Sequence, residues 1–129
     1  MITHSFDLDI TPTFPLNAVH LNQYDDDFML RMHLYSSKGE FVIESGTTVE
    51  IRGTKPDKSG YTSDSASLIE ESDGRYTVEV HGDQQMTDVY GKGIFELTLV
   101  NDGKLLSTAN FIIYVERAAF NRGDPGGEP

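Results

Sequence analysis

The pattern that decides the fold is clearest in the stretch Phe28–Tyr35, which reads FMLRMHLY. Every second residue from Phe28 to Leu34 is apolar, and the residues between them include Arg31 and His33. Successive side chains of a β-strand point to opposite faces of its sheet, so this alternation is typical of a strand with one buried face. We therefore expect this stretch to form a strand against the core.

The same alternation recurs on both sides of this stretch. Phe6, Leu8 and Ile10, for example, alternate with polar residues. Turn signals separate the segments, such as Asp73-Gly74 and the tight hairpin expected at Asn101-Asp102-Gly103-Lys104, and no window of helical length has a 3.6-residue period. The pattern predicts an all-β sandwich of about eight or nine strands, with one helical turn at most. Further strands are expected near residues 19–21, 49–51, 66–69, 76–80, 95–99 and 105–115, a helical turn near 84–88, and an exposed loop at 57–65.

The composition limits both the size of the core and the kinds of partner. Hydrophobic residues make up 37% of the 129 residues, which is enough for one core in one domain. The 21 acidic residues outnumber the 10 basic ones and give a formal net charge of -11. Such a charge disfavours binding to nucleic acid or to anionic membranes. The chain has no cysteine, which excludes disulfides, cysteine nucleophiles and thiolate zinc sites.

The last expected strand contains the uninterrupted apolar run Phe111–Val115. A run of this kind indicates burial on both faces or contact with a partner. Sandwich edges can also pair with another chain, so this strand and the strand at residues 5–10 are the candidate contact elements. The candidate interface residues are Phe6, Leu8, Ile10, Phe111, Ile113 and Val115.

The composition changes near the end of the chain. Residues 118–129 lead into a stretch rich in Gly and Pro with few side chains to bury, so we expect a flexible, disordered tail. The sandwich is accordingly predicted to span residues 1–117.

The sequence carries no pattern typical of a catalytic or metal site. Nucleophile elbows and phosphate-binding loops are missing, and the histidines lack the local spacing of zinc ligands. We therefore expect no enzymatic activity, no metal and no cofactor. Tyr24, Tyr61 and Tyr90 fall in or beside predicted loops, where exposed tyrosines are suited to contact with a ligand or a protein.

Spaced fragments carry a further signal, most of it in the second half of the chain. These fragments are Lys55-Pro56-Asp57, Gly60, Asp73-Gly74-Arg75-Tyr76, Met86-Thr87, Gly91, Ser107-Thr108, Phe111 and Val115. In order and spacing they resemble the N-terminal domain of the phage baseplate upper protein family, over roughly residues 4–117. Where that family often has a QGD-like segment, this chain has Gln23-Tyr24-Asp25, with Tyr in the Gly position.

The resemblance implies an immunoglobulin-like sandwich that serves as a structural part of a phage virion. Matching residues such as Pro56 and Gly91 then form the fold and do not catalyse a reaction. We expect a non-enzymatic phage or prophage protein, assembled in the bacterial cytoplasm and repeated as a homo-oligomer in a symmetric assembly. Its expected partners are other phage structural proteins, in the tail baseplate or at the major capsid protein, and neither nucleic acid nor membrane.

Two alternatives remain open at this point. Members of the family continue into a long stalk or fibre, whereas this chain ends at Pro129. It is therefore either a piece of such a protein or a stand-alone copy, which would suit a capsid decoration or head-fibre protein. A function of a different class is a carbohydrate-binding sandwich that recognises host-surface glycans through Tyr24, Tyr61 and Tyr90.

Overall fold

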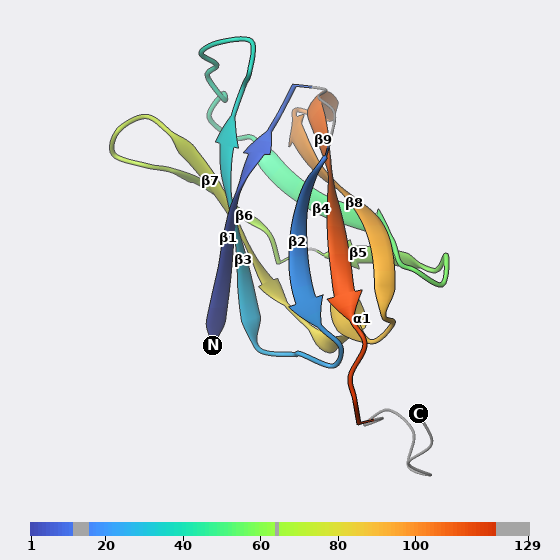
Figure 1. The fold of residues 1–129 in the computed structure, drawn as a ribbon. Helices are drawn as coiled ribbons and strands as arrows, with labels where there is room; N and C mark the ends of the chain where they lie inside the picture. The colour runs from blue at the N-terminus through green and yellow to red at the C-terminus, as the bar shows by residue number, and fades with distance from the viewer. Residues whose placement is uncertain (12–15, 64, 121–129) are drawn as a thin grey trace.

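A computed structural model describes residues 1–11, 16–63 and 65–120 of the chain, and these residues form two packed sheets (Figure 1). One sheet has the strand order β1-β3-β7-β6 and the other β2-β9-β8-β4-β5. The nine strands found in the described residues confirm the predicted all-β sandwich. The elements are β1 (Ile2–Asp9), β2 (Asn17–Asn22), β3 (Phe28–Tyr35), β4 (Thr48–Thr54), β5 (Gly60–Ser63), β6 (Ser67–Glu70), β7 (Tyr76–Gly82), α1 (Gln84–Thr87), β8 (Gly91–Asn101) and β9 (Lys104–Glu116).

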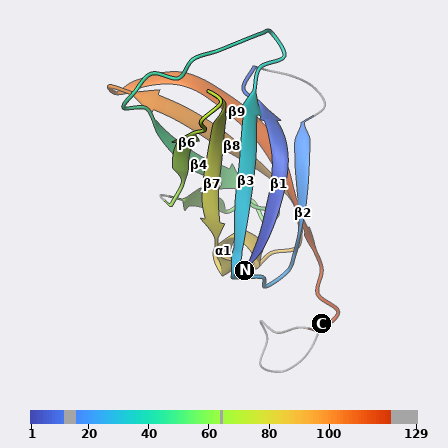
Figure 2. The same ribbon diagram turned by 90° about the vertical axis from the view of Figure 1, so that its left-hand side faces the viewer.

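The strand order is that of an immunoglobulin sandwich with two additional strands. In that fold, strands A, B, E and D form one sheet and strands C, F and G form the other. Here β1, β3, β7 and β6 take the first set of places, and β4, β8 and β9 take the second, while β2 and β5 extend the second sheet at its two edges. Two pairs depart from the antiparallel arrangement, because β2 pairs with β9 in parallel and β1 pairs with β3 in parallel. The strand between β1 and β3 in the sequence, β2, lies beside β9 in the opposite sheet and serves as their crossover connection (Figure 1). Figure 2 shows the sheet of β1, β3, β7 and β6 from its outer side.

The alternation in the sequence sets which side chains are buried. In β3 the side chains of Phe28, Leu30, Met32 and Leu34 are all buried, and the residues between them are more exposed. These side chains meet residues of β8 and β9 from the other sheet in one core. The prediction drawn from residues 28–35 is therefore confirmed.

Two phenylalanine rings lie over glycines of the neighbouring strand. Gly82 pairs with Phe28, and a Cβ atom added at Gly82 would lie 2.0 Å from the Phe28 ring. Gly53 pairs with Phe95 in the other sheet, where an added Cβ atom would lie 2.3 Å from the Phe95 ring. Within a strand, glycine often marks a place where another group approaches the backbone closely. These two glycines therefore provide space for a core ring.

Aromatic rings continue from these contacts across the interior. The centroid of the Phe111 ring lies 6.0 Å from that of Phe95 and 5.7 Å from that of Phe6. On the other side of Phe95, the Tyr61 ring lies 5.7 Å away in an edge orientation. Aromatic pairs at such separations add stability beyond that of their buried area. One row of rings thus connects β1, β9, β8 and β5 between the sheets.

Most expected elements are present, but the prediction for residues 57–65 was wrong in part. Residues 60–63 form β5, which pairs with β4 and buries Tyr61. A short polar sequence with Gly gave no strand signal, and pairing with β4 outweighs that local preference. The tight turn at Asp102-Gly103 is confirmed, since both residues have the positive φ that this hairpin type requires. The helical turn is confirmed as α1.

The end of β9 at Glu116 lies close to the predicted end of the sandwich. Residues 117–120 follow it without strand structure. Most of the predicted tail, residues 121–129, lies outside the described residues.

Replacing Gly82 by Ala should destabilise the fold, because the new methyl group would overlap the Phe28 ring. We expect the free energy of unfolding to fall by about 2–3 kcal/mol, as for other overpacked cores. Gly60→Ala is the matched control, since a Cβ atom at Gly60 has no atom within 4 Å. Urea unfolding of the two variants measures the difference, and equal unfolding midpoints would contradict this account of the glycines.

Candidate functional site

The side chains predicted to contact a partner lie inside the sandwich. Leu8, Phe111, Ile113 and Val115 are buried, and Phe6 and Ile10 are half-buried against the same core. The prediction of an interface made by these side chains was therefore wrong. The apolar run in β9 is not buried on both faces either, because its residues alternate: Tyr114 points outward between buried Ile113 and Val115.

The two strands predicted to contact a partner differ in how far their backbone edges are open to another strand. β9 pairs with β8 along one edge, and β2 covers Phe111–Glu116 of its other edge, so only the part of β9 before Phe111 lacks a strand partner on that side among the described strands. β1 lies at the edge of its sheet and pairs only with β3 among the described strands. Just beyond β1, the Ile10 N–H donates to the Tyr35 carbonyl at 2.8 Å. Backbone groups alternate in direction along a strand, so the N–H groups of Thr3, Ser5 and Asp7 point away from β3.

The three candidate ligand tyrosines surround α1 but differ in exposure. Tyr61 is only 5% exposed, and its hydroxyl lies 3.5 Å from the Asp83 carboxylate. Its assignment to an exposed ligand loop was wrong, because β5 turns the side chain into the core. Tyr24 is half-buried, and its N–H donates to the Thr87 carbonyl. Tyr90 is exposed, with the Arg117 guanidinium 5.1 Å from its ring centroid.

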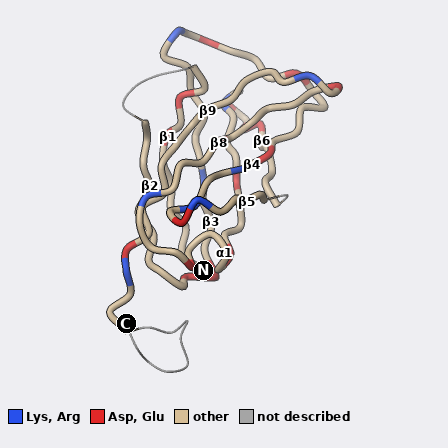
Figure 3. Tube along the Cα trace, turned by 90° about the vertical axis from the view of Figure 1, so that its right-hand side faces the viewer, with Lys and Arg blue, Asp and Glu red and all other residues tan. Residues whose placement is uncertain are grey.

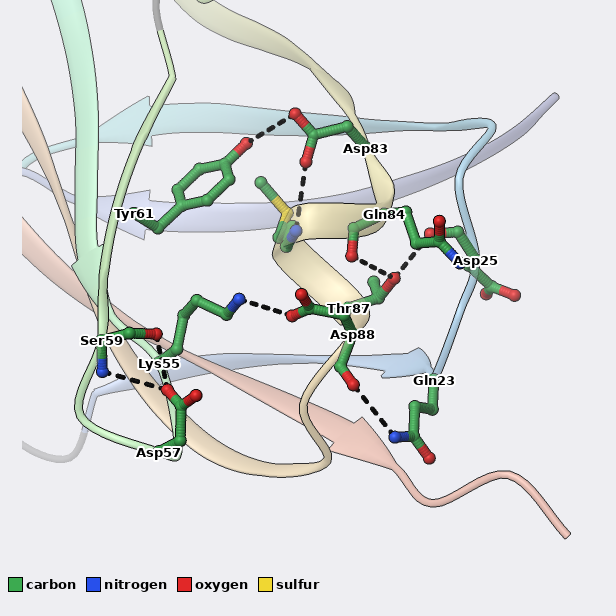
Figure 4. Close-up of polar contacts among 11 residues, drawn as sticks. Gln23, Asp25, Lys55, Asp57, Ser59, Tyr61, Asp83, Gln84, Thr87 and Asp88 are labelled. Carbon is green, nitrogen blue, oxygen red and sulfur yellow. Dashed lines mark hydrogen bonds and ion pairs between the residues drawn. The ribbon is translucent and has the colours of Figure 1, made fainter. Parts of the chain in front are cut away.

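Polar side chains from distant segments converge on α1 at one end of the sandwich (Figure 4). The Asp83 carboxylate caps the helix by accepting the Met86 N–H at 3.1 Å. The buried Thr87 hydroxyl donates to the Asp25 carbonyl at 2.6 Å, and the Gln23 side-chain amide donates to the Asp88 carbonyl at 3.1 Å. We call these contacts the α1 network. They connect the β2–β3 turn to the β7–β8 connection.

The β4–β5 turn joins the same network through a nearly buried lysine. The Lys55 ammonium lies 2.5 Å from the Asp88 carboxylate. The neighbouring Pro56 lies against Gly91, where an added Cβ atom would come within 3.1 Å of the Pro56 ring. Gly91 also has a φ of +121°, which favours glycine. Several of the spaced fragments noted in the sequence therefore meet here.

Two carboxylates have a lowered pKa, and both belong to turns. Burial raises the pKa of Asp9, but hydrogen bonds from Thr11 and Ser37 lower it by more. Hydrogen bonds from the Ser59 hydroxyl and N–H lower the pKa of Asp57. Both groups stay ionised in the folded protein and hold a turn, which is a structural role.

The histidines do not form a site. His4 lies against Phe28, His20 stacks on Tyr114 with their ring centroids 5.1 Å apart, and His81 lies 3.5 Å from Asp27. Among the described residues, no three His, Asp or Glu side chains are grouped so that they could hold a metal ion.

An open groove of about 1170 Å³ lies between the β3–β4 loop and the β6–β7 hairpin. Its charged residues are mainly acidic, with Asp7, Glu40, Glu71 and Asp73 beside a single arginine, Arg75. We call it the acidic groove. Apolar side chains also line it, including Tyr35, Phe41 and Val42.

A second open groove, of about 700 Å³, lies over β4, β8 and the β4–β5 turn. Figure 3 shows the backbone of these segments, with Lys and Arg in blue and Asp and Glu in red. Four cationic side chains line it together with one acid, Glu96. We call it the basic groove. The four cationic residues are Arg52, Lys55, Lys58 and Lys92.

An apolar strip that was not predicted from the sequence lies beside the basic groove. Ile94 of β8, Ile112 of β9 and Ala18 of β2 lie side by side in register on the outer face. Ile94 is 49% exposed. The signal was present in the unbroken apolar pairs Ile94-Phe95 and Ile112-Ile113, in which one member of each pair must face outward.

Removing the two partners of the Lys55–Asp88 ion pair should have unequal effects. The Lys55 side chain is 10% exposed and that of Asp88 is 43% exposed. Asp88→Ala leaves a nearly buried ammonium without its carboxylate and should lower the free energy of unfolding by about 2 kcal/mol. Lys55→Met leaves a carboxylate that water still reaches, so it should lower the free energy of unfolding by less than about 1 kcal/mol. Chemical unfolding of both variants tests the order, and a larger loss for Lys55→Met would contradict it.

The turn held by Asp9 should make stability depend on acid pH. Folding lowers the pKa of Asp9 below its ordinary value of 3.8. The contribution of Asp9 to the free energy of unfolding is therefore complete above pH 3.8, and it is lost as the pH falls through the lower pKa of the folded protein. Between about pH 5 and pH 2, wild type should lose more stability than Asp9→Asn. Thermal unfolding across this range measures both, and parallel losses would show that Asp9 contributes nothing.

Comparison with known proteins assigns no family to this chain. No protein-family model matches its sequence, and no curated protein matches it. In the described residues, no helix is long and apolar enough to cross a membrane. The function must therefore be argued from the surfaces and contacts given above.

Proposed function

We propose that this chain is a non-enzymatic structural protein of a phage or prophage virion, docked on the tail baseplate or on the capsid. The observation that carries the proposal is the convergence at α1 of fragments from distant parts of the chain. Lys55, Pro56, Thr87 and Gly91 carry the family resemblance, and all four contribute to packing or bonding at this end. This supports a match at the level of the fold.

The open edge of β1 is the proposed docking element. An extended segment of a partner can add to such an edge through backbone hydrogen bonds. Natural sandwiches often protect long edges with lysine, proline or a bulge. β1 is eight residues long, and its sequence ITHSFDLD contains neither lysine nor proline. Docking through the backbone keeps β1 as a contact element while its inward side chains stay in the core.

The carbohydrate-binding alternative has less support, because it relies on three exposed tyrosines. Tyr61 is in the core and Tyr24 is half-buried, so only Tyr90 is exposed among the three candidates. That ring already contacts Arg117. A glycan array probed with the purified protein distinguishes the two functions, because saturable sugar binding that is lost in Tyr90→Ala would favour the alternative.

Ser5→Pro tests the docking element directly. The Ser5 N–H points away from β3, so proline there removes no hydrogen bond within the sheet and is tolerated at an edge. We expect a folded protein that is incorporated at least about tenfold less into phage particles than wild type, since a blocked strand addition loses its backbone bonds. Mass spectrometry of gradient-purified particles measures incorporation, with Ser5→Val as the control that keeps the N–H.

Each outcome of this experiment bears on a separate claim. Absence of the wild-type chain from all particles would reject the virion role. Normal incorporation of folded Ser5→Pro would reject the β1 edge as the docking element and leave the virion role in place.

A further inference from the structure

We propose that copies of this chain bind one another head to tail, with the basic groove of one copy against the acidic groove of the next. The grooves lie on opposite sides of the sandwich, the acidic one beside β3 and β7 and the basic one over β4 and β8. A contact between them joins one face of a copy to the opposite face of its neighbour. The inference concerns contact between copies, and it does not depend on a virion location.

The distribution of cations is the first reason. The chain has only 10 lysines and arginines, and four of them line the basic groove. Arg52 is already paired with Glu50 at 2.8 Å, and Lys55 with Asp88. Lys58 and Lys92, both exposed, therefore provide most of the attraction for an acidic partner.

The acidic groove offers the complementary charges. Its one arginine, Arg75, lies 3.5 Å from Asp73. Asp7, Glu40 and Glu71 are exposed on the remaining lining. Opposite charges facing each other across a contact favour one docking geometry, and like charges oppose the others. Two basic grooves or two acidic grooves would repel, so the charges select the head-to-tail arrangement.

Exposed apolar side chains accompany the charges on both surfaces. Ile94 lines the basic groove and is 49% exposed, and Val42 lines the acidic groove and is 85% exposed. Interfaces combine an apolar centre with a charged rim, and both grooves contain these two components. A second copy of this chain therefore supplies the charge and the apolar surface that each groove lacks.

The backbone of Lys58 is the second reason. Its φ is +74°, in the left-handed region that costs free energy for residues other than glycine. Its N–H donates to the Lys55 carbonyl at 2.8 Å and so holds the turn in this form. The sequence places a cation at the groove where glycine would suit the backbone better. Strain of this kind concentrates at functional positions.

A contact between two different surfaces has a consequence for assembly. Because each terminal copy keeps one unused groove, the assembly adds further copies until it closes into a ring, or it grows as a filament. A symmetric ring of sandwiches is one product of such a contact. A symmetric dimer is not, since two grooves on opposite sides of one copy cannot both face the same neighbour.

Charge reversal in each groove, followed by mixing, tests the proposal. Lys58→Glu with Lys92→Glu makes the basic groove acidic, and Glu40→Lys with Glu71→Lys makes the acidic groove basic. Sedimentation velocity over a range of concentrations should show wild type self-associating and each variant alone associating at least about tenfold more weakly. The mixture should associate again, because each altered groove then meets an opposite charge. Lys104→Glu, in the β8–β9 hairpin, is the control for a charge reversal outside the two grooves.

Three results would overturn the proposal. Wild type that stays monomeric at every concentration would exclude binding between copies. Variants that associate as well as wild type would show that the grooves are not the contact. Variants that fail to associate both alone and when mixed would show that the two grooves do not face each other.

Lys58→Gly separates function from stability at the same position. Glycine relieves the positive φ, so the thermal unfolding midpoint should rise, while self-association should weaken because a cation is lost. A purely structural lysine would give the first change without the second, and that result would count against the proposal.

Discussion

The contact on which the rest of the sandwich depends is that of a phenylalanine ring with the glycine opposite it in the next strand. The Phe28 ring lies over Gly82 in one sheet, and the Phe95 ring lies over Gly53 in the other. Both rings are almost completely buried. Phe95 then touches Phe111, which brings β9 and β1 into the same row of rings. A side chain at either glycine would push its ring into neighbouring core residues, which have no free space in a close-packed interior.

Much of the fold could be predicted from the alternation of apolar and polar residues. The alternation located β3, and the turn residues located the hairpin at Asp102-Gly103, because both features depend on local geometry. It missed β5, since Gly60–Ser63 becomes a strand only through pairing with β4. It also left the parallel pairing of β1 with β3 undetermined, because the direction of a pair is set by the path of the chain between sheets.

The candidate site was harder to predict for a physical reason. Apolar residues in strands are evident in a sequence, but the face that each one occupies depends on register. Phe111 and Val115 were therefore assigned to a partner although they form the core, while Ile112 and Tyr114 face outward. The grooves escaped notice because Lys58 and Lys92 lie far apart in the chain. Only the pairing of β4 with β8 brings the β4–β5 turn, which carries Lys58, to the strand that carries Lys92.

The polar residues divide into two groups with different roles. Those around α1, such as Asp83 and Thr87, are engaged within the chain and fix one end of the sandwich. Most of the charged residues in the two grooves are exposed, and each groove carries mainly one sign of charge, whereas Lys55 is buried and belongs to both groups. The proposed activity is therefore binding through outer surfaces and the β1 edge, with the interior reserved for stability. Cryo-electron microscopy of particles from the bacterium that encodes this chain is the most direct test. We predict repeated copies of the sandwich with the β1 edge covered by another protein; copies with β1 open to solvent, or no copies on any particle, would contradict it.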